Sequence, residues 1–320
     1  MILYRSLDEI TAPLRDAVVT IGNFDGVHLG HREIFRKLKR EAAEIGGVSV
    51  VVTFDPHPLK VLPTPRSVTL INTVEEKITL IEASGVDYLV IIPFNMEFAT
   101  IAAEEFVRGV LLARLGMKRL VIGHDYAFGR NREGNVNLLR QLGAELSFVV
   151  EELAPITDGQ VVYSSSLVRR MILAGEVADV VHFLGRNFSV AGTVVHGEKR
   201  GKLLGFPTAN IATDKELIPA DGVYAVKVRI ADALYDGACN IGDNPTFHGE
   251  KRTVEVFIFD FTGELYGEEV RVYFFERLRG EEKFASIEEL VGAIDRDVAL
   301  CRRILSERQL VVYSDYLEGL

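Results

Sequence analysis

The sequence contains no tryptophan and only two cysteines, Cys239 and Cys301. Two cysteines so far apart do not indicate a disulfide framework or a zinc knuckle. The few histidines form no cluster either, so we expect no permanently bound metal. The first ten residues carry acidic side chains and lack the basic start and apolar centre of a secretion signal. These features together predict a protein of the reducing cytoplasm.

Long apolar runs and an excess of basic residues are absent as well. No uninterrupted apolar run approaches the roughly 20 residues that span a bilayer, so we expect no membrane partner. The formal net charge is -10, and acidic residues outnumber basic ones on both sides of Gly185. The basic footprint of a nucleic-acid-binding protein is therefore absent, and we expect no such partner. The 48% hydrophobic and 26% charged residues are typical of globular proteins with buried cores.

The first half of the chain alternates short β-branched runs with amphipathic helical stretches. This alternation predicts a parallel sheet covered by helices, a doubly wound α/β domain of the Rossmann-like type. The predicted strands end at Gly22, Phe54, Ile92, Gly123 and Glu151. Residues 31–45 carry apolar side chains at helical spacing and predict the first covering helix.

The sequence pattern changes near Gly185, where short predicted strands separated by Gly, Pro and Asp begin. This pattern predicts a small antiparallel β-barrel. Residues 286–306 return to a helical period, so one C-terminal helix is expected to cover the barrel. The 320 residues are therefore expected to form two domains, residues 1–185 and residues 186–320. The sequence does not indicate an oligomeric state.

The string GNFDGVHLGH, residues 22–31, lies between a predicted strand and a predicted helix. Glycines let backbone amides approach an anion, and a helix N-terminus favours negative charge. His28 and His31 can donate hydrogen bonds to phosphoryl oxygens as charge develops on them. The string is neither a Walker A loop nor a G-x-G-x-x-G fingerprint. The alternative reading is a Gly-rich turn with two incidental histidines.

Together with three later segments, this string resembles the FAD synthetase branch of the nucleotidyltransferases. The segments are TFDPHP (53–58), GHDYAFGRNREG (123–134) and SSSLVR (164–169), the last with Ser166 in place of the usual Thr. The resemblance implies that ATP and its phosphates are bound by Gly22, Phe24, Asp25, Gly26, His28, His31, Ser164, Ser165, Ser166 and Arg169. It assigns flavin contacts to Phe54, Pro56, His57, Asp125 and Phe128. Several of these segments follow predicted strand ends, where parallel sheets bind ligands.

The string GTVVHGEKRGKLLGFPTANI, residues 192–211, resembles the riboflavin kinase signature, with Lys202 where Arg is usual. The likeness continues through segments near residues 221, 240, 253, 265 and 278. It implies that ATP is bound by Gly197, Gly201, Lys202, Thr208 and Asn210, and flavin by Glu255 and Arg279. Thr208 and Asn210 supply hard oxygen ligands of the kind that Mg²⁺ prefers.

Glu255 is the candidate catalytic base of the second half. By strand alternation it shares a face with Phe257 and Phe259, away from the apolar residues between them. The resemblance implies that its carboxylate accepts the proton of the ribityl hydroxyl that attacks ATP. Many relatives carry His where Phe257 stands, so we assign no chemistry to that position. The alternative for Glu255 is an ion pair on the strand face.

The leading expectation is a bifunctional FAD-synthesising enzyme with riboflavin, FMN and ATP as substrates. Mg²⁺ would accompany ATP, and FMN and FAD would be substrate and product, not prosthetic groups. One alternative keeps only one activity, with the other domain a flavin-binding remnant. Two further alternatives are a flavin-sensing or RNA-binding regulator and a transferase with another phosphate acceptor. The net charge argues against the regulator, and the kinase half argues against another acceptor.

Overall fold

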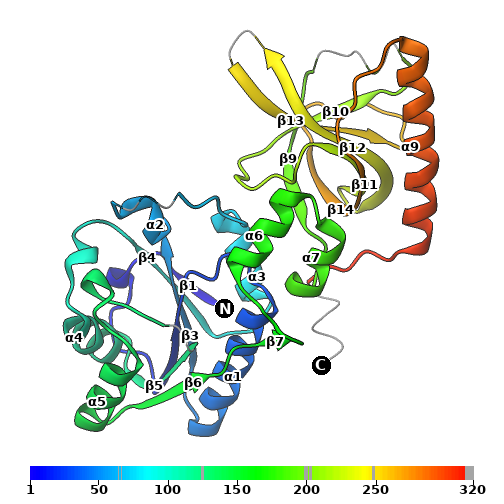
Figure 1. The fold of residues 1–320 in the computed structure, drawn as a ribbon. Helices are drawn as coiled ribbons and strands as arrows, with labels where there is room; N and C mark the ends of the chain where they lie inside the picture. The colour runs from blue at the N-terminus through cyan, green and yellow to red at the C-terminus, as the bar shows by residue number, and fades with distance from the viewer. Residues whose placement is uncertain are drawn as a thin grey trace. The chain divides into compact units, whose positions relative to one another are not determined.

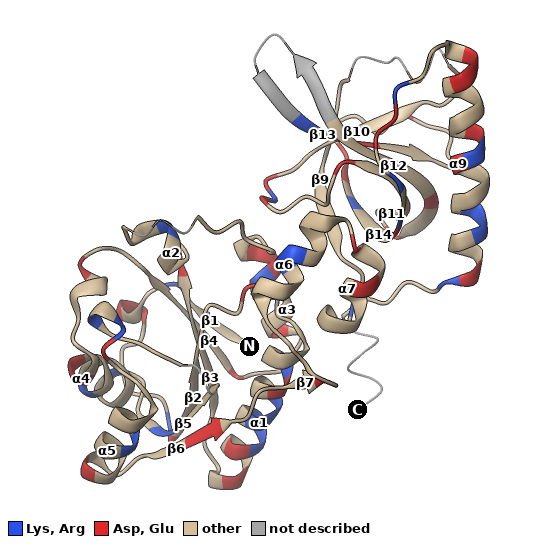
Figure 2. Ribbon diagram, viewed as in Figure 1, with Lys and Arg blue, Asp and Glu red and all other residues tan. Residues whose placement is uncertain are grey.

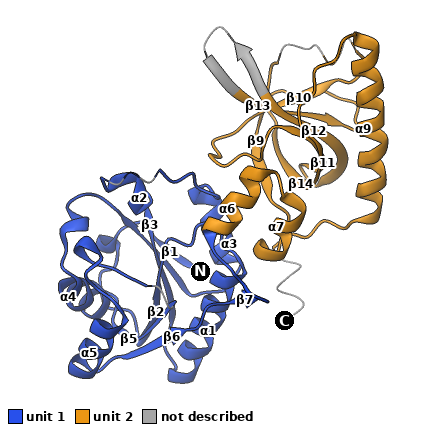
Figure 3. Ribbon diagram, viewed as in Figure 1, with its two compact units in different colours: residues 1–165 blue, residues 166–320 orange. Residues whose placement is uncertain are grey.

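The computed structural model describes residues 1–63, 65, 67–123, 126–197, 201, 204–246 and 249–313. The chain divides into two compact units, Met1–Ser165 and Ser166–Leu320 (Figure 3). The first unit holds a sheet covered by helices, and the second holds a closed barrel with a long helix (Figure 1). Among the described residues, no helix combines the length and the apolar character needed to cross a membrane.

The first unit is built on one parallel sheet, which has six strands in the described part of the chain, in the order β1-β4-β3-β2-β5-β6. The strands are β1 (Ile2–Tyr4), β2 (Ala17–Ile21), β3 (Ser49–Asp55), β4 (Tyr88–Pro93), β5 (Met117–Gly123) and β6 (Val149–Leu153). All neighbouring strands run parallel. The five predicted strands are confirmed. The short edge strand β1 was not among them, because three residues carry too little pattern to indicate a strand.

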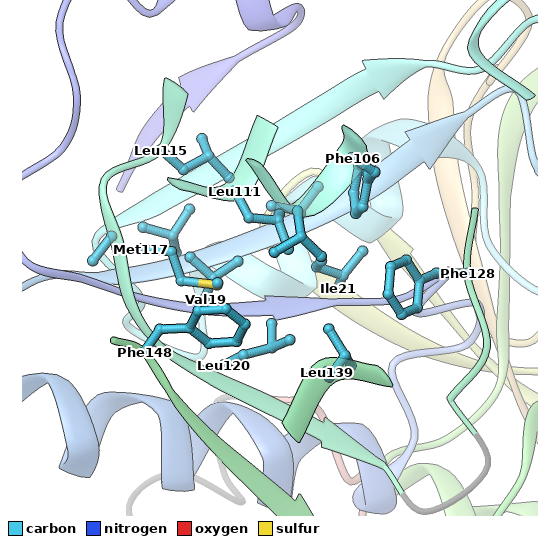
Figure 4. Close-up of a cluster of buried hydrophobic side chains, with 14 of the residues drawn as sticks. Val19, Ile21, Phe106, Leu111, Leu115, Met117, Leu120, Phe128, Leu139 and Phe148 are labelled. Atoms are coloured by element: carbon cyan, nitrogen blue, oxygen red, sulfur yellow. The ribbon is translucent and has the colours of Figure 1, made fainter. Parts of the chain in front are cut away.

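Helices cover both faces of this sheet. The α-helices are α1 (Leu29–Ile45), α2 (Pro58–Val61), α3 (Val74–Glu82), α4 (Ala103–Glu105) and α5 (Val136–Leu146). The 3-10 helices are η1 (Leu7–Glu9), η2 (Phe98–Thr100) and η4 (Arg130–Arg132), and η3 (Phe106–Arg114) is a π-helix. Val19 and Ile21 of β2 pack with η3 and α5 in one core cluster (Figure 4). The alternate residue Val18 faces the opposite side, where α1 contacts β2, β3 and β5. The doubly wound arrangement is confirmed. A small hairpin, β7 (Thr157–Asp158) and β8 (Val161–Val162), follows β6.

The second unit contains a closed barrel of antiparallel strands, in the order β10-β13-β12-β11-β14-β9 for the described residues. They are β9 (Ser189–Val195), β10 (Thr208–Ala212), β11 (Gly222–Ile230), β12 (Ala233–Thr246), β13 (Gly249–Ile258) and β14 (Glu269–Arg279). β9 pairs with both β10 and β14 and so closes the barrel. The predicted antiparallel barrel is confirmed. Thr208 and Asn210 lie on β10, although the sequence motif that contains them did not indicate a strand.

The barrel has an apolar interior and an outer face covered by α9 (Ile287–Glu307). Val254 and Val256 of β13 are buried, whereas Phe259 packs outward in a cluster with Cys301 and Leu305 of α9. Ser286 caps α9 by accepting a hydrogen bond from the backbone N–H of Glu289. Acidic and basic residues both occur along this helix (Figure 2). The predicted C-terminal helix is confirmed.

Two helices precede the barrel, α6 (Ser165–Ala174) and α7 (Val177–Leu184). α7 contacts β14, and the turn between the helices lies against the barrel at Gly175. A β-carbon on Gly175 would lie 2.6 Å from Arg277 Cδ and 2.9 Å from the Tyr224 hydroxyl. The contacts therefore place most of α6 and all of α7 with the barrel, whereas the sequence pattern changes at Gly185. Residues 186–320 as a self-sufficient domain stay a prediction.

Candidate functional sites

The loop between β2 and α1, residues 22–28, lies where β2 ends at the carboxyl edge of the sheet. Phe24, Gly26 and Val27 have positive φ angles of 47°, 84° and 37°, which L side chains adopt only when packing enforces them. The buried Phe24 ring supplies that packing, because it meets Phe35 of α1 edge-on at a centroid distance of 4.9 Å. This loop, which we call the Gly loop, is therefore held in one unusual conformation.

The two histidines of the Gly loop region lie together at the start of α1. Their rings stack at a centroid distance of 3.7 Å and an interplanar angle of 21°, and Phe24 packs edge-on against His31 at 5.2 Å. His28 is only 5% exposed. The first turn of α1 carries no acidic residue, and the His28 side chain makes no capping bond. Such a helix N-terminus favours an anion.

Asp25 was assigned by resemblance to ATP binding, and the structure shows that its carboxylate also anchors the chain. It is 2% exposed and accepts hydrogen bonds from the backbone N–H groups of Ile71, at 3.0 and 3.2 Å, and Asn72, at 3.3 Å. These two residues come directly before α3, whose N-cap is Thr73. Asp25 therefore ties α3 to the Gly loop. Its contact with ATP stays a prediction.

The N-terminal end of the serine-rich segment 164–169 also contacts the Gly loop. The Ser165 hydroxyl donates a 2.8 Å hydrogen bond to the backbone oxygen of Asp25. A β-carbon on Gly30 would lie 3.3 Å from Tyr163 Cβ, so the backbones approach closely there. Ser164 precedes α6, whereas Ser166 and Arg169 lie within that helix. Phosphate binding by these serines and by Arg169 stays a prediction.

The predicted flavin segment, residues 53–58, follows β3. The Thr53 hydroxyl donates to the backbone oxygen of Asn23 at 3.2 Å, which connects this segment to the Gly loop. His57 is 6% exposed, and its Nδ1 accepts the Leu59 N–H at 3.1 Å, which caps α2. Pro56 follows a cis peptide bond. We call residues 55–58 the Pro turn. Its backbone is fixed by the histidine cap, and its flavin contacts stay predictions.

The remaining predicted flavin contacts belong to an aromatic cluster. Phe54 meets Phe94 at 5.5 Å and Phe98 at 6.1 Å. Phe128 is 8% exposed and stacks on Tyr126 at 5.4 Å. Burial raises the pKa of Tyr126, so its phenol stays neutral at physiological pH. Asp125 lies outside the described residues. Both phenylalanines pack in or against the sheet core, so any contact with flavin would use only part of each ring.

Lys77 is a feature of this site that sequence reasoning missed. It lies in α3 on the same buried stripe as Leu80 and Ile81, and it is 6% exposed. Burial lowers the pKa of Lys77, and the charges of Asp25 and Asp55 oppose that shift. The available signal was a lysine at the apolar phase of a short amphipathic helix.

The second site lies on paired strands of the barrel. In the strand register, Glu255 of β13 stands opposite Asn210 of β10 on one side and Asn240 of β12 on the other. The Thr208 hydroxyl is 3.4 Å from a carboxylate oxygen of Glu255. Glu255 is half-buried, with Val254 and Val256 on the buried interior face, so the predicted alternation is confirmed. The structure therefore brings together Thr208, Asn210 and Glu255.

The glycines assigned to ATP lie against these same polar residues. A β-carbon on Gly197 would overlap the side-chain amide of Asn210. A β-carbon on Gly201 would overlap the backbone oxygen of Phe206 and lie 3.4 Å from the Thr208 hydroxyl. Gly201 also accepts the Phe206 N–H at 2.8 Å. Only glycine fits either position without displacing its neighbours. Lys202 lies outside the described residues.

Arg279, the second predicted flavin contact of this half, has a protein partner. Its Nη2 donates to Asp297 of α9 at 2.8 Å, and its Nε lies 3.1 and 3.3 Å from the two carboxylate oxygens. The guanidinium also lies over the Phe284 ring at 5.6 Å. Arg279 therefore holds the end of β14 against α9, and a flavin contact stays a prediction.

The described residues contain no cluster of classical ligands for a resident metal. No group of three or more His, Cys, Asp or Glu side chains in the described ranges could hold an ion. The hydroxyl of Thr208, the amide oxygen of Asn210 and the carboxylate of Glu255 are nevertheless hard oxygen donors. Such a set fits Mg²⁺ that arrives with nucleotide phosphates and keeps several waters.

These features define a class: a nucleotidyltransferase-type domain with stacked histidines beside a Gly loop, followed by a β-barrel kinase-type domain. The comparisons with known proteins agree in both halves. The family model for FAD synthetase matches residues 10–167, and the model for riboflavin kinase matches residues 184–305. The two matches lie in the same order as the two units.

Relatives match along nearly the whole chain. A protein of Escherichia coli (strain K12) is 35% identical over 304 residues, 94% of this chain and 97% of its own. One of Pseudomonas fluorescens is 37% identical over 305 residues, 95% of this chain and 98% of its own. Both carry the name bifunctional riboflavin kinase/FMN adenylyltransferase. This chain belongs to that family.

A solved structure shares the fold of both units. It is described as a macrolide-efflux protein from Streptococcus pneumoniae, with a TM-score of 0.85 and 34% sequence identity. The match covers 94% of this chain and 98% of that chain. The efflux role in that description belongs to that protein, and the comparison with this chain concerns the fold.

Proposed function

We propose that this protein converts riboflavin to FAD in two ATP-dependent steps. The barrel phosphorylates riboflavin to FMN, and the Rossmann-like domain transfers an adenylyl group from ATP to FMN. The observation that carries the proposal is the presence of two separate polar constellations in one chain: the stacked pair His28 and His31 beside the Gly loop, and Glu255 with Thr208 in the barrel. Each constellation lies in a range that a different family model matches, FAD synthetase for the first and riboflavin kinase for the second.

In the kinase step, Glu255 is the general base. Its carboxylate accepts the proton of the terminal ribityl hydroxyl, whose oxygen attacks the γ-phosphorus of ATP. The bond from the γ-phosphorus to the bridging oxygen breaks, and ADP leaves with the electron pair. Thr208 and Asn210 would hold Mg²⁺ and ATP phosphate oxygens, and the ion would neutralise charge on those phosphates. Gly197, Gly201 and Lys202 would lie along the nucleotide.

In the adenylyl-transfer step, a phosphate oxygen of FMN attacks the α-phosphorus of ATP. The bond to the bridging oxygen breaks, and pyrophosphate leaves. His28 and His31 donate hydrogen bonds to phosphoryl oxygens as negative charge develops on them, which is the usual role of positioned donors in such reactions. The N-terminus of α1 adds a favourable dipole. Ser164, Ser165, Ser166 and Arg169 would bind the departing phosphates.

The proposal also covers location and partners. Both cysteines are buried and unbridged, which supports the reducing cytoplasm as the working compartment. The net charge of -10 gives no electrostatic support for nucleic acid as a partner. FMN and FAD pass through the protein as intermediate and product, and Mg²⁺ accompanies ATP.

The test is a product analysis. The purified protein is incubated with riboflavin, ATP and Mg²⁺, and the flavins are separated at several times. We expect FMN to appear first and FAD to follow, with ADP and pyrophosphate as coproducts. A second reaction starts from FMN. FMN that accumulates from riboflavin, with no FAD formed in either reaction, would leave only the kinase. Riboflavin and FMN that both stay unchanged would refute the proposal.

A further inference from the structure

The Lys77 side chain is buried on the apolar stripe of α3 with an amine at its end. It is 6% exposed, and within the described ranges of the chain its ammonium has neither a hydrogen bond nor an ion pair. Burying an ammonium without a close partner is costly, and an apolar side chain of similar length would fit such a position at less cost. A lysine at this position calls for a role that methionine or leucine does not fill.

Two carboxylates act on this ammonium from neighbouring strands. Asp25 lies in the Gly loop after β2, and Asp55 ends β3, the strand beside β2. Their charges raise the pKa of Lys77 and so oppose the larger, lowering effect of burial. Both carboxylates thus belong to the edge of the sheet that carries the candidate site. The Lys77 ammonium therefore interacts electrostatically with one residue of the Gly loop and one of the Pro turn.

The anchoring of α3 fixes the position of Lys77. The helix begins with a capping box in which Thr73 and Glu76 bond each other's backbone N–H groups. Asp25 accepts the N–H groups of Ile71 and Asn72, which directly precede this helix start. The same loop that presents His28 and His31 therefore also sets where the Lys77 backbone lies.

We propose that Lys77 is a positioning residue of the adenylyl-transfer site, whose ammonium balances the charges of Asp25 and Asp55 beside two anionic substrates. ATP and FMN would both approach an edge of the sheet that already carries these two carboxylates. Without the cation, the carboxylates repel both substrates, and the Gly loop and Pro turn lose their common counter-ion. The inference rests on the proposed adenylyl transfer.

The experiment compares steady-state kinetics of FAD formation from FMN in wild type, Lys77→Met and Lys77→Arg. We expect Lys77→Met to raise KM for ATP and for FMN by about tenfold each, with kcat lowered less, because the charge acts on substrate binding as much as on reaction. Lys77→Arg keeps the charge and should recover most of the loss. The kinase reaction of the same samples should stay unchanged.

A matched control separates this role from general stability. Lys37 of α1 also lies between two carboxylates, Glu41 at 2.7 Å and Glu151 at 3.2 Å, away from the Gly loop. Lys37→Met removes a lysine that neighbours two carboxylates in the same unit. It should leave both KM values unchanged, although the loss of its two ion pairs lowers the thermal midpoint.

The pH dependence of kcat/KM tests the charge of Lys77 separately from its packing. Burial lowers the pKa of Lys77, so the ammonium is lost as pH rises through a value below that of an ordinary lysine. The charged groups that act on it are the carboxylates of Asp25 and Asp55. In wild type, kcat/KM for FAD formation should therefore fall on the alkaline side. In Lys77→Arg this fall should move to higher pH, because arginine keeps its proton.

The outcomes are distinct. Wild-type protein that makes no FAD from FMN would refute the proposed adenylyl transfer itself. Wild-type activity with unchanged KM values in Lys77→Met would overturn the role of Lys77. An identical alkaline limb in wild type and Lys77→Arg, or a loss in Lys37→Met as large as in Lys77→Met, would also overturn it.

Discussion

The two units build their candidate sites from different kinds of backbone. In the first unit, many of the residues lie in the Gly loop and the Pro turn, at the ends of β2 and β3. Side-chain bonds to backbone, such as Asp25 to Ile71 and His57 to Leu59, hold these loops. In the second unit, Thr208, Asn210 and Glu255 lie inside paired strands, where the register sets their spacing. The first site depends on anchors and torsion angles, the second on strand pairing.

This difference affects what a substitution does. Residues on strands of a closed barrel have little freedom to move, so a change there alters chemistry more than geometry. Residues in anchored loops depend on distant partners, so loss of an anchor displaces several functional groups together. The independence of the two sites is the point most open to test.

The largest effect is expected for Glu255→Gln. The amide keeps the size of the side chain but removes the proton acceptor, so riboflavin phosphorylation should fall by about 100- to 10,000-fold. FAD formation from supplied FMN should continue at the wild-type rate, measured by flavin chromatography. Retained kinase activity would favour the alternative role of Glu255, an ion pair on the strand face. Loss of both activities would show that the units are coupled.

A slightly smaller effect is expected for His28→Ala and His31→Ala. Each removes one donor beside the Gly loop, and FAD formation should fall by about 100- to 1,000-fold. FMN formation from riboflavin should stay near wild type in the same samples. Equal loss of both reactions would contradict separate sites.

Gly197→Ala should have an intermediate effect, confined to the kinase. The new methyl group would overlap the Asn210 amide and displace it, and such small displacements cost about 10- to 100-fold in rate. Gly292→Ala is the matched control, because a β-carbon on that residue of α9 meets only the Arg296 guanidinium at 3.6 Å. Equal kinase rates in both variants would show that residue 197 does not set the position of Asn210.

The smallest effect on activity is expected for shortened chains. Residues 186–320 and residues 166–320 should both phosphorylate riboflavin, since the barrel has its own core. The longer fragment should unfold at higher urea concentration, because Val177, Val180 and Leu184 are fully buried and each such side chain contributes about 1.5–3 kcal/mol. Equal urea midpoints would mean that α7 adds nothing, and an insoluble shorter fragment would mean that the barrel needs it.

Much of this molecule could be predicted because its signals are local. Buried parallel strands read as apolar runs, and alternation along β13 separates Glu255 from Val254 and Val256 without knowledge of any partner strand. The Gly loop could be predicted for the same reason, because its glycines and histidines all lie within ten consecutive residues.

The rest depends on contacts between distant residues. Asp25 meets the N–H groups of residues 71 and 72, and Arg279 pairs with Asp297, yet nothing in either stretch of sequence specifies its partner. Lys77 is charged at a position where the helix pattern predicts an apolar side chain. Only the fold shows which carboxylates act on its ammonium. The edge strand β1 forms because β4 offers it a partner.

The alignment of Asn210, Glu255 and Asn240 across β10, β13 and β12 has a consequence for how this barrel can change over time. Because side chains alternate between faces, adding or deleting one residue within β13 would turn Glu255 inward and bring Val254 or Val256 to its place. Residue types along the strand are open to exchange, whereas its length is not. Length variation among descendants should therefore gather in the connection between β13 and β14 and leave the strand itself untouched.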